Sequence, residues 1–491
     1  MFKNGIILAS ITMLSRILGL VRETAMGIYF GVSSQVDAFN SSFRVANLFR
    51  QLLGEGALGN TFIPIYNRKE KEKGKEEARR LIYSVLNVLF AFLIILTLLQ
   101  IIFAEQIMKA IASGFSPAKN ILSAELLRIM SVYILFIGMS GMIGSILNNF
   151  KQFIIPASTS LFFNFAMIFA AIFFKDKFGI YPIAWGVTVG GFLQLLVVLP
   201  SFFKTFGKYS FVIDKKDPYL KEIFVNLLPM LLGVFGWQIN VIVGQTFASY
   251  LPDGSMSALA KANNIYLLPL GVFGTTISTL IFPTMAKATA SGDKLSVNKT
   301  VNGGLKLVSL LVVPSTIAFT FLAKDIVRVI FGYGKFDEFA ITITAQCLLF
   351  YSLGLIFNNG MQILTRVFYS HKNNKDPVRF SLISIGINIF INFLASFILP
   401  VEYRHMGLAL ASSITLGINF YQLYKKANKD YVEFDSKNLV KFTARTIITS
   451  LMAFIPTMFF DNSFAKIIIF SIVYLILWAK PLMKGGLNEF R

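Results

Sequence analysis

Fourteen mainly apolar stretches follow one another along this chain of 491 residues. A helix that crosses a bilayer needs about 20 such residues, and only helices and closed barrels satisfy their backbone hydrogen bonds inside lipid. Hydrophobic residues make up 55% of the chain, more than a soluble protein usually contains. We therefore predict an all-α polytopic membrane protein with 14 transmembrane helices. The predicted spans are residues 5–30, 36–66, 81–104, 122–149, 155–174, 180–203, 223–250, 257–286, 301–322, 339–370, 379–400, 406–424, 438–459 and 464–482.

The loops between these spans differ in charge, and the difference predicts which side of the membrane each loop occupies. The loop after the second span, NRKEKEKGKEEARR, contains seven Lys or Arg residues, whereas the loops GVSSQ and YLPDGS after the first and seventh spans contain none. Cytoplasmic loops of membrane proteins are enriched in Lys and Arg. We therefore predict that both termini are cytoplasmic. No small-residue cleavage site follows the first apolar stretch, so we predict a retained span rather than a signal peptide.

The enrichment of cytoplasmic loops in Lys and Arg also explains the formal net charge of +21. The basic residues gather in alternate loops, and no nucleic-acid-binding motif accompanies them. The sequence contains no Walker A motif, no HExxH or Cys-rich metal spacing, and no convincing Ser-His-Asp set. We therefore expect no nucleic-acid partner, no bound metal and no enzymatic activity. Cys347 is the only cysteine, so an intrachain disulfide is impossible.

Two pairs of similar segments indicate an internal duplication. AEQIMKAIASGF, starting at Ala104, resembles AKDIVRVIFGYG, starting at Ala323, and TFIPIYNRK around Pro64 resembles LIFPTMAKA around Pro283. Both pairs are separated by 219 positions. A shared offset over six spans predicts a parallel repeat of two six-helix lobes, a plan in which transporters place a substrate cavity between the lobes. The predicted domains are residues 1–218, residues 219–437, and residues 438–491 with two extra C-terminal helices.

Charged residues interrupt the first two spans. An Arg at the centre of a span costs about 2.5–3.5 kcal/mol, so such residues usually face protein or water. Four Arg residues between positions 16 and 50 exceed the two nearby acidic residues, and guanidinium groups match phosphate oxygens well. We predict a cationic cavity for a phosphate-bearing ligand; the alternative is that the charges only neutralise one another structurally. The candidate substrate-binding residues are Arg16, Arg22, Asp37, Arg44, Arg50 and Lys261.

Helical geometry predicts a wide cavity rather than a tight pocket. Asp37 and Arg44 are seven residues apart and share a helix face, whereas Arg50 is rotated away from Arg44 by about 120°. Gly54 and Gly56 follow, and glycines permit a bend, so we predict a hinge there.

Four segments resemble the MurJ/MviN family of the multidrug/oligosaccharidyl-lipid/polysaccharide exporter superfamily. They are SRILGLVRE (15–23), VDAFNSSFRVANLFRQLLGEGALGNTFIPIY (36–66), LPLGVFGTTISTLIFPTMAK (268–287) and QILTRVFYSHKNNKDP (362–377). The resemblance covers spans one to twelve, and two extra C-terminal spans are also typical of this family. It implies a flippase that moves lipid II, the undecaprenyl-pyrophosphate-linked peptidoglycan precursor, from the inner to the outer leaflet of the bacterial cytoplasmic membrane by alternating access.

The resemblance also assigns roles to residues and partners. The family's essential charged residues match Arg16, Arg22, Asp37 and Arg50, and Arg44 stands where a basic residue is usual. In the family, the last two spans help to form a groove for the lipid tail. The implied partners are lipid II and membrane lipids, and other proteins of cell-wall synthesis are candidate partners.

This chain departs from the family pattern at two places. Asn264 occupies a span-eight position where the family usually has Arg, and we predict that Lys261, one turn earlier, supplies the missing cation. Some members bind a cation through carboxylates in spans seven and eleven; the matching positions are Gly244 and Asn392, with Asn388 beside the latter, so sodium coupling is doubtful. We expect no cofactor, and we expect the membrane potential to drive transport.

Two other classes of function fit parts of the pattern. Another exporter, such as a flippase for a different polyprenyl-linked oligosaccharide or a cation-coupled drug exporter, would share the fold. A drug exporter should have an acidic cavity for cationic drugs, whereas the predicted cavity is basic. A non-transporting scaffold for envelope synthesis would tolerate the loss of Arg22.

Overall fold

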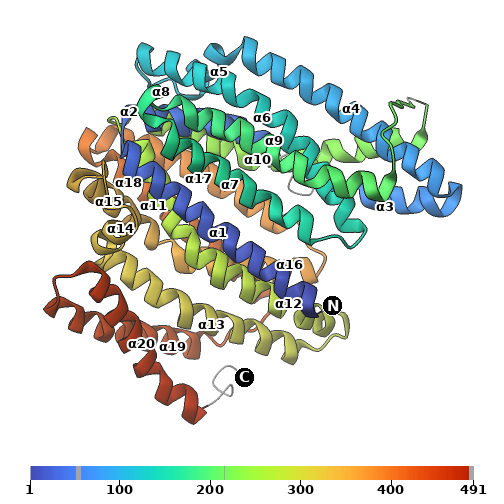
Figure 1. The fold of residues 1–491 in the computed structure, drawn as a ribbon. Helices are drawn as coiled ribbons and strands as arrows, with labels where there is room; N and C mark the ends of the chain where they lie inside the picture. Colours follow the sequence, from blue (N-terminus) through green and yellow to red (C-terminus); the bar gives the residue numbers. More distant parts are fainter. Residues whose placement is uncertain (1, 51–56, 215, 486–491) are drawn as a thin grey trace. The chain divides into compact units, whose positions relative to one another are not determined.

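The computed structural model describes residues 2–50, 57–214 and 216–485, and helices dominate all three ranges (Figure 1). Contacts divide the chain into two units, Met1–Gly254 and Ser255–Arg491. The helices of the first unit are α1 (Phe2–Phe30), α2 (Ser34–Phe49), α3 (Ala57–Lys73), α4 (Lys75–Ile102), α5 (Ala104–Ile111), α6 (Pro117–Asn149), α7 (Ile154–Phe173), α8 (Lys175–Phe178), α9 (Tyr181–Phe206) and α10 (Pro218–Ser249).

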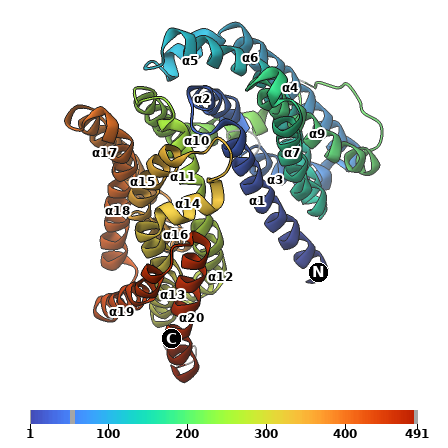
Figure 2. The ribbon, with the colours of Figure 1, turned by 60° about the vertical axis from the view of Figure 1, so that its left-hand side comes forward.

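In the described residues of the second unit, all regular secondary structure is helical (Figure 2). Its elements are α11 (Ser255–Pro269), the π-helix η2 (Leu270–Gly274), α12 (Thr275–Ala290), α13 (Lys294–Phe321), α14 (Ala323–Phe331), α15 (Glu338–Ser352), α16 (Leu355–Ser370), α17 (Lys375–Ile398), the short 3₁₀-helix η3 (Val401–Tyr403), α18 (Arg404–Asp430), α19 (Ser436–Phe454), the 3₁₀-helix η4 (Ile455–Phe459) and α20 (Ser463–Gly485).

Within the described residues, each of the fourteen predicted spans coincides with one long helix or with two or more consecutive helices. Within the described ranges, eight helices are long and apolar enough to cross a membrane on their own. A ninth crossing is formed if α15 and α16, which meet at a 41° bend, act as one span. The predicted all-α membrane fold is confirmed, whereas the number of fourteen crossings stays a prediction.

The repeated segments adopt matching local structures. The short helices α5 and α14 begin at Ala104 and Ala323, the two residues that align in the sequence repeat. Pro64 and Pro283 both lie inside helices, in α3 and α12. The contact division falls after Gly254 and so groups α10 with the first unit. The lobe boundaries at 218 and 437 stay predictions, because they rest on a sequence repeat and a division by contacts does not test for a repeat.

Close packing of α7 against α9 organises the first unit. Gly186 and Gly190 lie one turn apart on α9, and a Cβ atom added to Gly190 would lie 3.2 Å from the Cα atom of Phe163 on α7. Small residues at such spacing let two membrane helices approach each other closely. In turn, α1 packs on α7, so residues of α7 are brought beside the charged part of α1.

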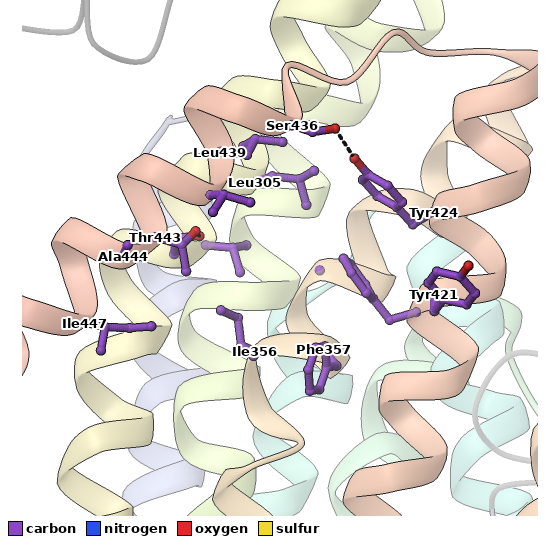
Figure 3. A pocket seen from close by; sticks show the side chains of 15 residues that line it. Leu305, Ile356, Phe357, Tyr421, Tyr424, Ser436, Leu439, Thr443, Ala444 and Ile447 are labelled. Carbon is purple, nitrogen blue, oxygen red and sulfur yellow. Dashed lines mark hydrogen bonds between the residues drawn. The ribbon is translucent and has the colours of Figure 1, made fainter.

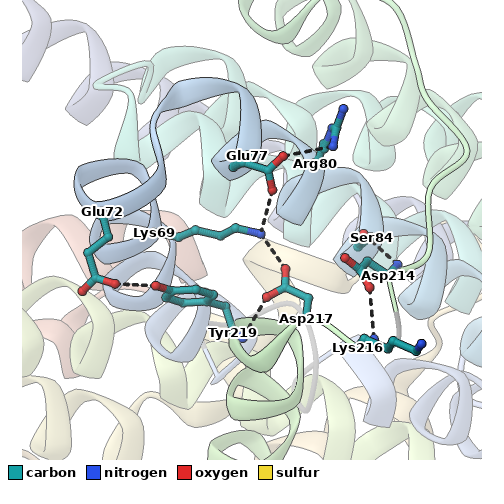
Figure 4. Close-up of polar contacts among 9 residues, drawn as sticks. All are labelled: Lys69, Glu72, Glu77, Arg80, Ser84, Asp214, Lys216, Asp217 and Tyr219. Carbon is teal, nitrogen blue, oxygen red and sulfur yellow. Dashed lines mark hydrogen bonds and ion pairs between the residues drawn. The ribbon is translucent and has the colours of Figure 1, made fainter.

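A buried ion pair fastens the start of α10 to α3 (Figure 4). Lys69 Nζ lies 2.6 Å from Asp217 Oδ2, and both side chains are almost fully buried. Asp217 also caps α10 by accepting a hydrogen bond from the backbone N–H of Tyr219 at 2.9 Å. The Tyr219 hydroxyl donates to the Glu72 carboxylate, which raises the pKa of Tyr219 above its ordinary value.

Candidate substrate-binding site

Arg22 is held in a defined orientation between α1 and α7. Its Nη2 donates to Oε1 of Glu23 at 2.7 Å, and its Nη1 donates to Oδ1 of Asn164 at 3.1 Å. The guanidinium carbon lies 5.7 Å from the centroid of the Phe163 ring. The Arg22 side chain is 19% exposed, and its Nε is buried without a hydrogen-bond partner among the described residues. The group is therefore positioned by protein contacts while keeping unused donor capacity.

Polar contacts along α1 and α7 explain why the helices align in this way. Ser15 Oγ donates to Ser160 Oγ at 2.7 Å, and Asn164 Nδ2 donates to the Ser15 carbonyl at 3.3 Å. Ser160 and Asn164 are one helical turn apart, so they share a face of α7. Asn164 was not among the predicted site residues, and Glu23 had no predicted role. The available signal was an Asn inside the apolar segment LFFNFAMIF, because polar residues inside membrane spans are usually functional.

Asp37 belongs to a different charged cluster, at the start of α2. Its Oδ2 accepts hydrogen bonds from Lys119 Nζ at 3.0 Å and from the Gly254 backbone N–H at 2.7 Å. Lys119 also lies 2.8 Å from Asp253 Oδ1. Gly254 has φ of +89°, a conformation that side chains disfavour, so glycine suits this contact. Lys119 was missing from our predicted residues, and no pattern in the sequence linked it to Asp37.

The other candidates of the first unit have separate surroundings. Arg16 is exposed on α1, and Arg44 is half-buried on α2. Because α2 is continuous from Ser34 to Phe49, Asp37 and Arg44 lie on the same side of it, as predicted. Arg50 follows α2, where its Nε donates to Asn47 Oδ1 at 2.7 Å. The predicted hinge at Gly54 and Gly56 lies outside the described residues.

Lys261 lies on α11 in the second unit, where it contacts aromatic rings. Its Nζ is 4.9 Å from the ring centroid of Phe331 and 5.9 Å from that of Phe336. The residue is 2% exposed. Cation–π contacts of this kind stabilise a buried ammonium group. In this conformation the aromatic contacts hold Lys261, and its predicted role as a substrate-binding cation stays a prediction.

The second unit also contains an apolar groove of about 570 Å³ (Figure 3). Its walls are formed by α13, α16, α18 and α19, and a hydrogen bond of 2.6 Å between Tyr424 and Ser436 lies at its edge. α19 is the first of the two extra C-terminal helices, whereas none of the described side chains of α20 lines the groove. The lining residues are Leu305, Val308, Ser309, Ile356, Phe357, Gly360, Phe420, Tyr421, Tyr424, Ser436, Leu439, Val440, Thr443, Ala444 and Ile447.

Of the two positions that match the family's cation site, Gly244 has no side chain, and Asn392, with Asn388 beside it, carries an amide group. Asn392 Nδ2 donates to Asn388 Oδ1 at 3.0 Å, and Asn388 Nδ2 donates to Thr415 Oγ1 at 3.2 Å. Within the described part of the chain, no group of three or more His, Cys, Asp or Glu residues is placed to hold a metal ion.

Comparison with known proteins first defines the class. A solved multidrug resistance transporter of the MATE family of the MOP superfamily matches 86% of this chain and 98% of its own with a TM-score of 0.72. At 12% identity this match shows the fold alone. Together with the apolar helices long enough to cross a membrane, this fold defines the class as a polytopic α-helical membrane protein.

The family is defined by closer matches. The model of the family "Lipid II flippase MurJ" matches residues 26–477, and the chain belongs to this family. A probable lipid II flippase MurJ of Buchnera aphidicola subsp. Acyrthosiphon pisum is 35% identical over 87% of this chain and 83% of its own. The lipid II flippase MurJ of Burkholderia cenocepacia is 30% identical over 92% and 88%. A solved lipid II flippase MurJ in an inward closed conformation matches with 31% identity, a TM-score of 0.83, and coverage of 98% and 99%.

Proposed function

We propose that this protein is a lipid II flippase of the bacterial inner membrane. Family membership over residues 26–477 carries the proposal. The protein is a multi-pass membrane protein of a transporter family, and no chemical step is required of it. Lipid II joins a pyrophosphate headgroup to a long apolar tail, so a protein that flips it must offer a cationic site to one part and an apolar surface to the other.

The headgroup binds through the arginines of the first unit. Arg22 supports this assignment best, because Glu23 and Asn164 hold its guanidinium while Nε keeps a free N–H. Bidentate contacts between guanidinium and phosphate oxygens are strong and directional. In our proposal Arg16, Arg44, Arg50 and Lys261 add positive charge, and Asp37 competes with the phosphate for cations and so eases release.

The lipid tail occupies the groove of the second unit. The groove is almost entirely apolar, and α19, one of the two extra C-terminal helices, forms one wall of it (Figure 3). Burial of each CH₂ group of the tail contributes about 0.8 kcal/mol relative to water. The tail can leave for lipid at little cost, because lipid is equally apolar.

The direction of transport follows from the orientation that the loop charges predict. With both termini in the cytoplasm, the headgroup enters from the cytoplasmic leaflet and leaves on the outer side by alternating access. Proteins of cell-wall synthesis that make and consume lipid II are the candidate partners.

Complementation of a flippase-depleted bacterium tests the proposal. We expect Arg22→Ala, Asp37→Ala, Arg50→Ala and Lys261→Ala to abolish or strongly reduce growth and the appearance of lipid II in the outer leaflet. Arg80→Ala is the matched control, because Arg80 is an exposed cation on α4 whose ion pair with Glu77 is worth little. Full growth with Arg22→Ala, at a normal amount of protein in the membrane, would instead support a scaffold.

A further inference from the structure

The membrane helix α17 buries a polar face. Beyond its first turn, its buried side chains are Ser384, Asn388 and Asn392. They are spaced four residues apart and therefore share one side of the helix. The apolar residues Leu382 and Phe390 lie on other sides and are 55% and 61% exposed. α17 thus turns apolar residues outward and a polar stripe inward, and polar stripes inside membrane proteins commonly mark pathways.

The partner of this stripe is α18, which runs antiparallel to α17. Asn388 Nδ2 lies 3.2 Å from Thr415 Oγ1, which makes these two residues opposite neighbours. A Cβ atom added to Gly407 would lie 3.0 Å from Cβ of Ala395, which gives the same register further along the pair. In an antiparallel pair, one turn back along α17 corresponds to one turn forward along α18.

This register places Ser384 opposite Asn419. Asn419 is buried on α18, and Gln422 follows it by three residues on the same face. The seam between the two helices therefore continues as a row of hydroxyl and amide groups toward the end that carries Lys426. We call this row the polar seam; its members are Asn392, Asn388, Thr415, Ser384, Asn419 and Gln422.

Four buried oxygen atoms of the polar seam have no hydrogen-bond partner within the described residues. They are Ser384 Oγ, Asn392 Oδ1, Asn419 Oδ1 and Gln422 Oε1. Buried polar groups in proteins are almost always paired, and an unpaired one inside a membrane is costly. Four such atoms in one row need partners that the described residues do not supply. Water is the smallest group that can bridge several of them at once.

We propose that the polar seam binds a file of water molecules. The seam offers neutral acceptors and donors and no charged side chain, which is a composition suited to water. The water molecules hydrate the interface between α17 and α18 from Asn388 and Asn392 to the end near Lys426. It is thus a hydrated path into a membrane-spanning part of the second unit, and it does not depend on which lipid the protein moves.

Cysteine accessibility in nanodiscs tests the proposal. Only the thiolate reacts with methanethiosulfonate reagents, and a thiol ionises where water reaches it. The native chain is a suitable background, because Cys347 is its only cysteine and is buried. We expect Ser384→Cys and Asn419→Cys to react with a small cationic methanethiosulfonate at least tenfold faster than Leu382→Cys and Phe390→Cys, which face lipid. Equal rates in well-folded protein would overturn the proposal.

A stability measurement provides a second test that needs no labelling. If the seam is dry, Asn419→Leu removes an unpaired amide and raises the unfolding temperature, because apolar replacement of an unsatisfied group is neutral or stabilising. If water fills the seam, the same change removes a partner of bound water and lowers the unfolding temperature by several degrees. Ile414→Leu, at an exposed position of the same helix, is the control. An unchanged or higher unfolding temperature for Asn419→Leu would contradict a water-filled seam.

Discussion

At the scale of single residues, two of the charged groups within the membrane helices, Arg22 and Asp37, have partners on other helices. Arg22 and Asn164 are 142 positions apart in the chain, and Asp37 and Lys119 are 82 apart. Such contacts reduce the cost of placing charge in the membrane. These contacts also fix the orientation of the Arg22 guanidinium, and a binding site for a phosphate group requires such fixed side chains.

The amide of Asn164 should matter for transport, because it positions Arg22. Asn164→Ala removes the acceptor for Nη1, and hydrogen bonds to charged groups contribute about 1.5–3 kcal/mol. We expect the rate of lipid II flipping to fall about tenfold or more. Asn164→Asp, which keeps an acceptor, should retain more activity than Asn164→Ala. Asn149→Ala, which removes a half-buried amide outside this site, serves as the control. Wild-type flipping by Asn164→Ala would show that Glu23 alone positions Arg22.

At the scale of elements, close helix packing carries the site. α9 supports α7 through Gly186 and Gly190, and α7 presents Phe163 and Asn164 to Arg22 on α1. The site therefore depends on a helix that contributes no charged residue to it. The buried Lys69–Asp217 pair has a comparable role at the start of α10, where it joins α10 to α3 (Figure 4).

Gly190→Ala tests the packing of α7 on α9. The new Cβ atom would lie 2.8 Å from Cδ2 of Phe163, so α7 must move. Overpacking of this kind costs about 1–3 kcal/mol, even though Ala favours helices more than Gly. We expect a lower unfolding temperature and slower flipping. Gly386→Ala is the matched control, because its Cβ would meet no atom within 4 Å, and it should be neutral or stabilising. Equal behaviour of the two variants would argue against the packing role.

The Lys69–Asp217 pair should contribute strongly to stability. Removing one partner of a buried ion pair leaves an uncompensated charge and costs about 3–5 kcal/mol. We therefore expect Lys69→Met to lower the unfolding temperature markedly. Arg80→Met, which breaks the exposed pair with Glu77, should change stability by less than about 1 kcal/mol. Similar unfolding temperatures for the two variants would mean that the buried pair is not important for stability.

At the scale of the whole molecule, the chain consists of two helical units and contains a sequence repeat whose copies share local structure. Transporters with a repeat of this kind rock one part against the other around a site near the middle of the membrane. In our proposal the moving charge is the pyrophosphate of the substrate.

The membrane potential should therefore change the rate of transport. Moving two negative charges out of a negative interior is favourable by about 4.6 kcal/mol per 100 mV. We expect flipping in sealed vesicles to accelerate when a potassium gradient and valinomycin make the interior negative. Vesicles clamped at zero potential are the control. A flipping rate that ignores the imposed potential would exclude the potential as the driving force.

The helical type and the order of the elements could be predicted from the sequence, whereas the number of fourteen crossings stays a prediction. Wherever the structure describes them, the predicted spans are helical, because each span must satisfy its own backbone hydrogen bonds and face lipid. Arg22 and Asp37 could be recognised as unusual because a charged side chain inside a membrane span is costly. Their partners Asn164 and Lys119 were not predicted, because neither periodicity nor spacing relates residues on different helices.

Local apolarity and loop charge thus determined the class of protein, since lipid and water act on each segment separately. Tertiary structure alone decided which side chains meet. It placed Asn164 beside Arg22, put Lys261 against Phe331, and formed an apolar groove from α13, α16, α18 and α19. The physical reason is that helices in a membrane associate through shape and a few polar contacts, and these depend on register and rotation that one helix by itself does not specify.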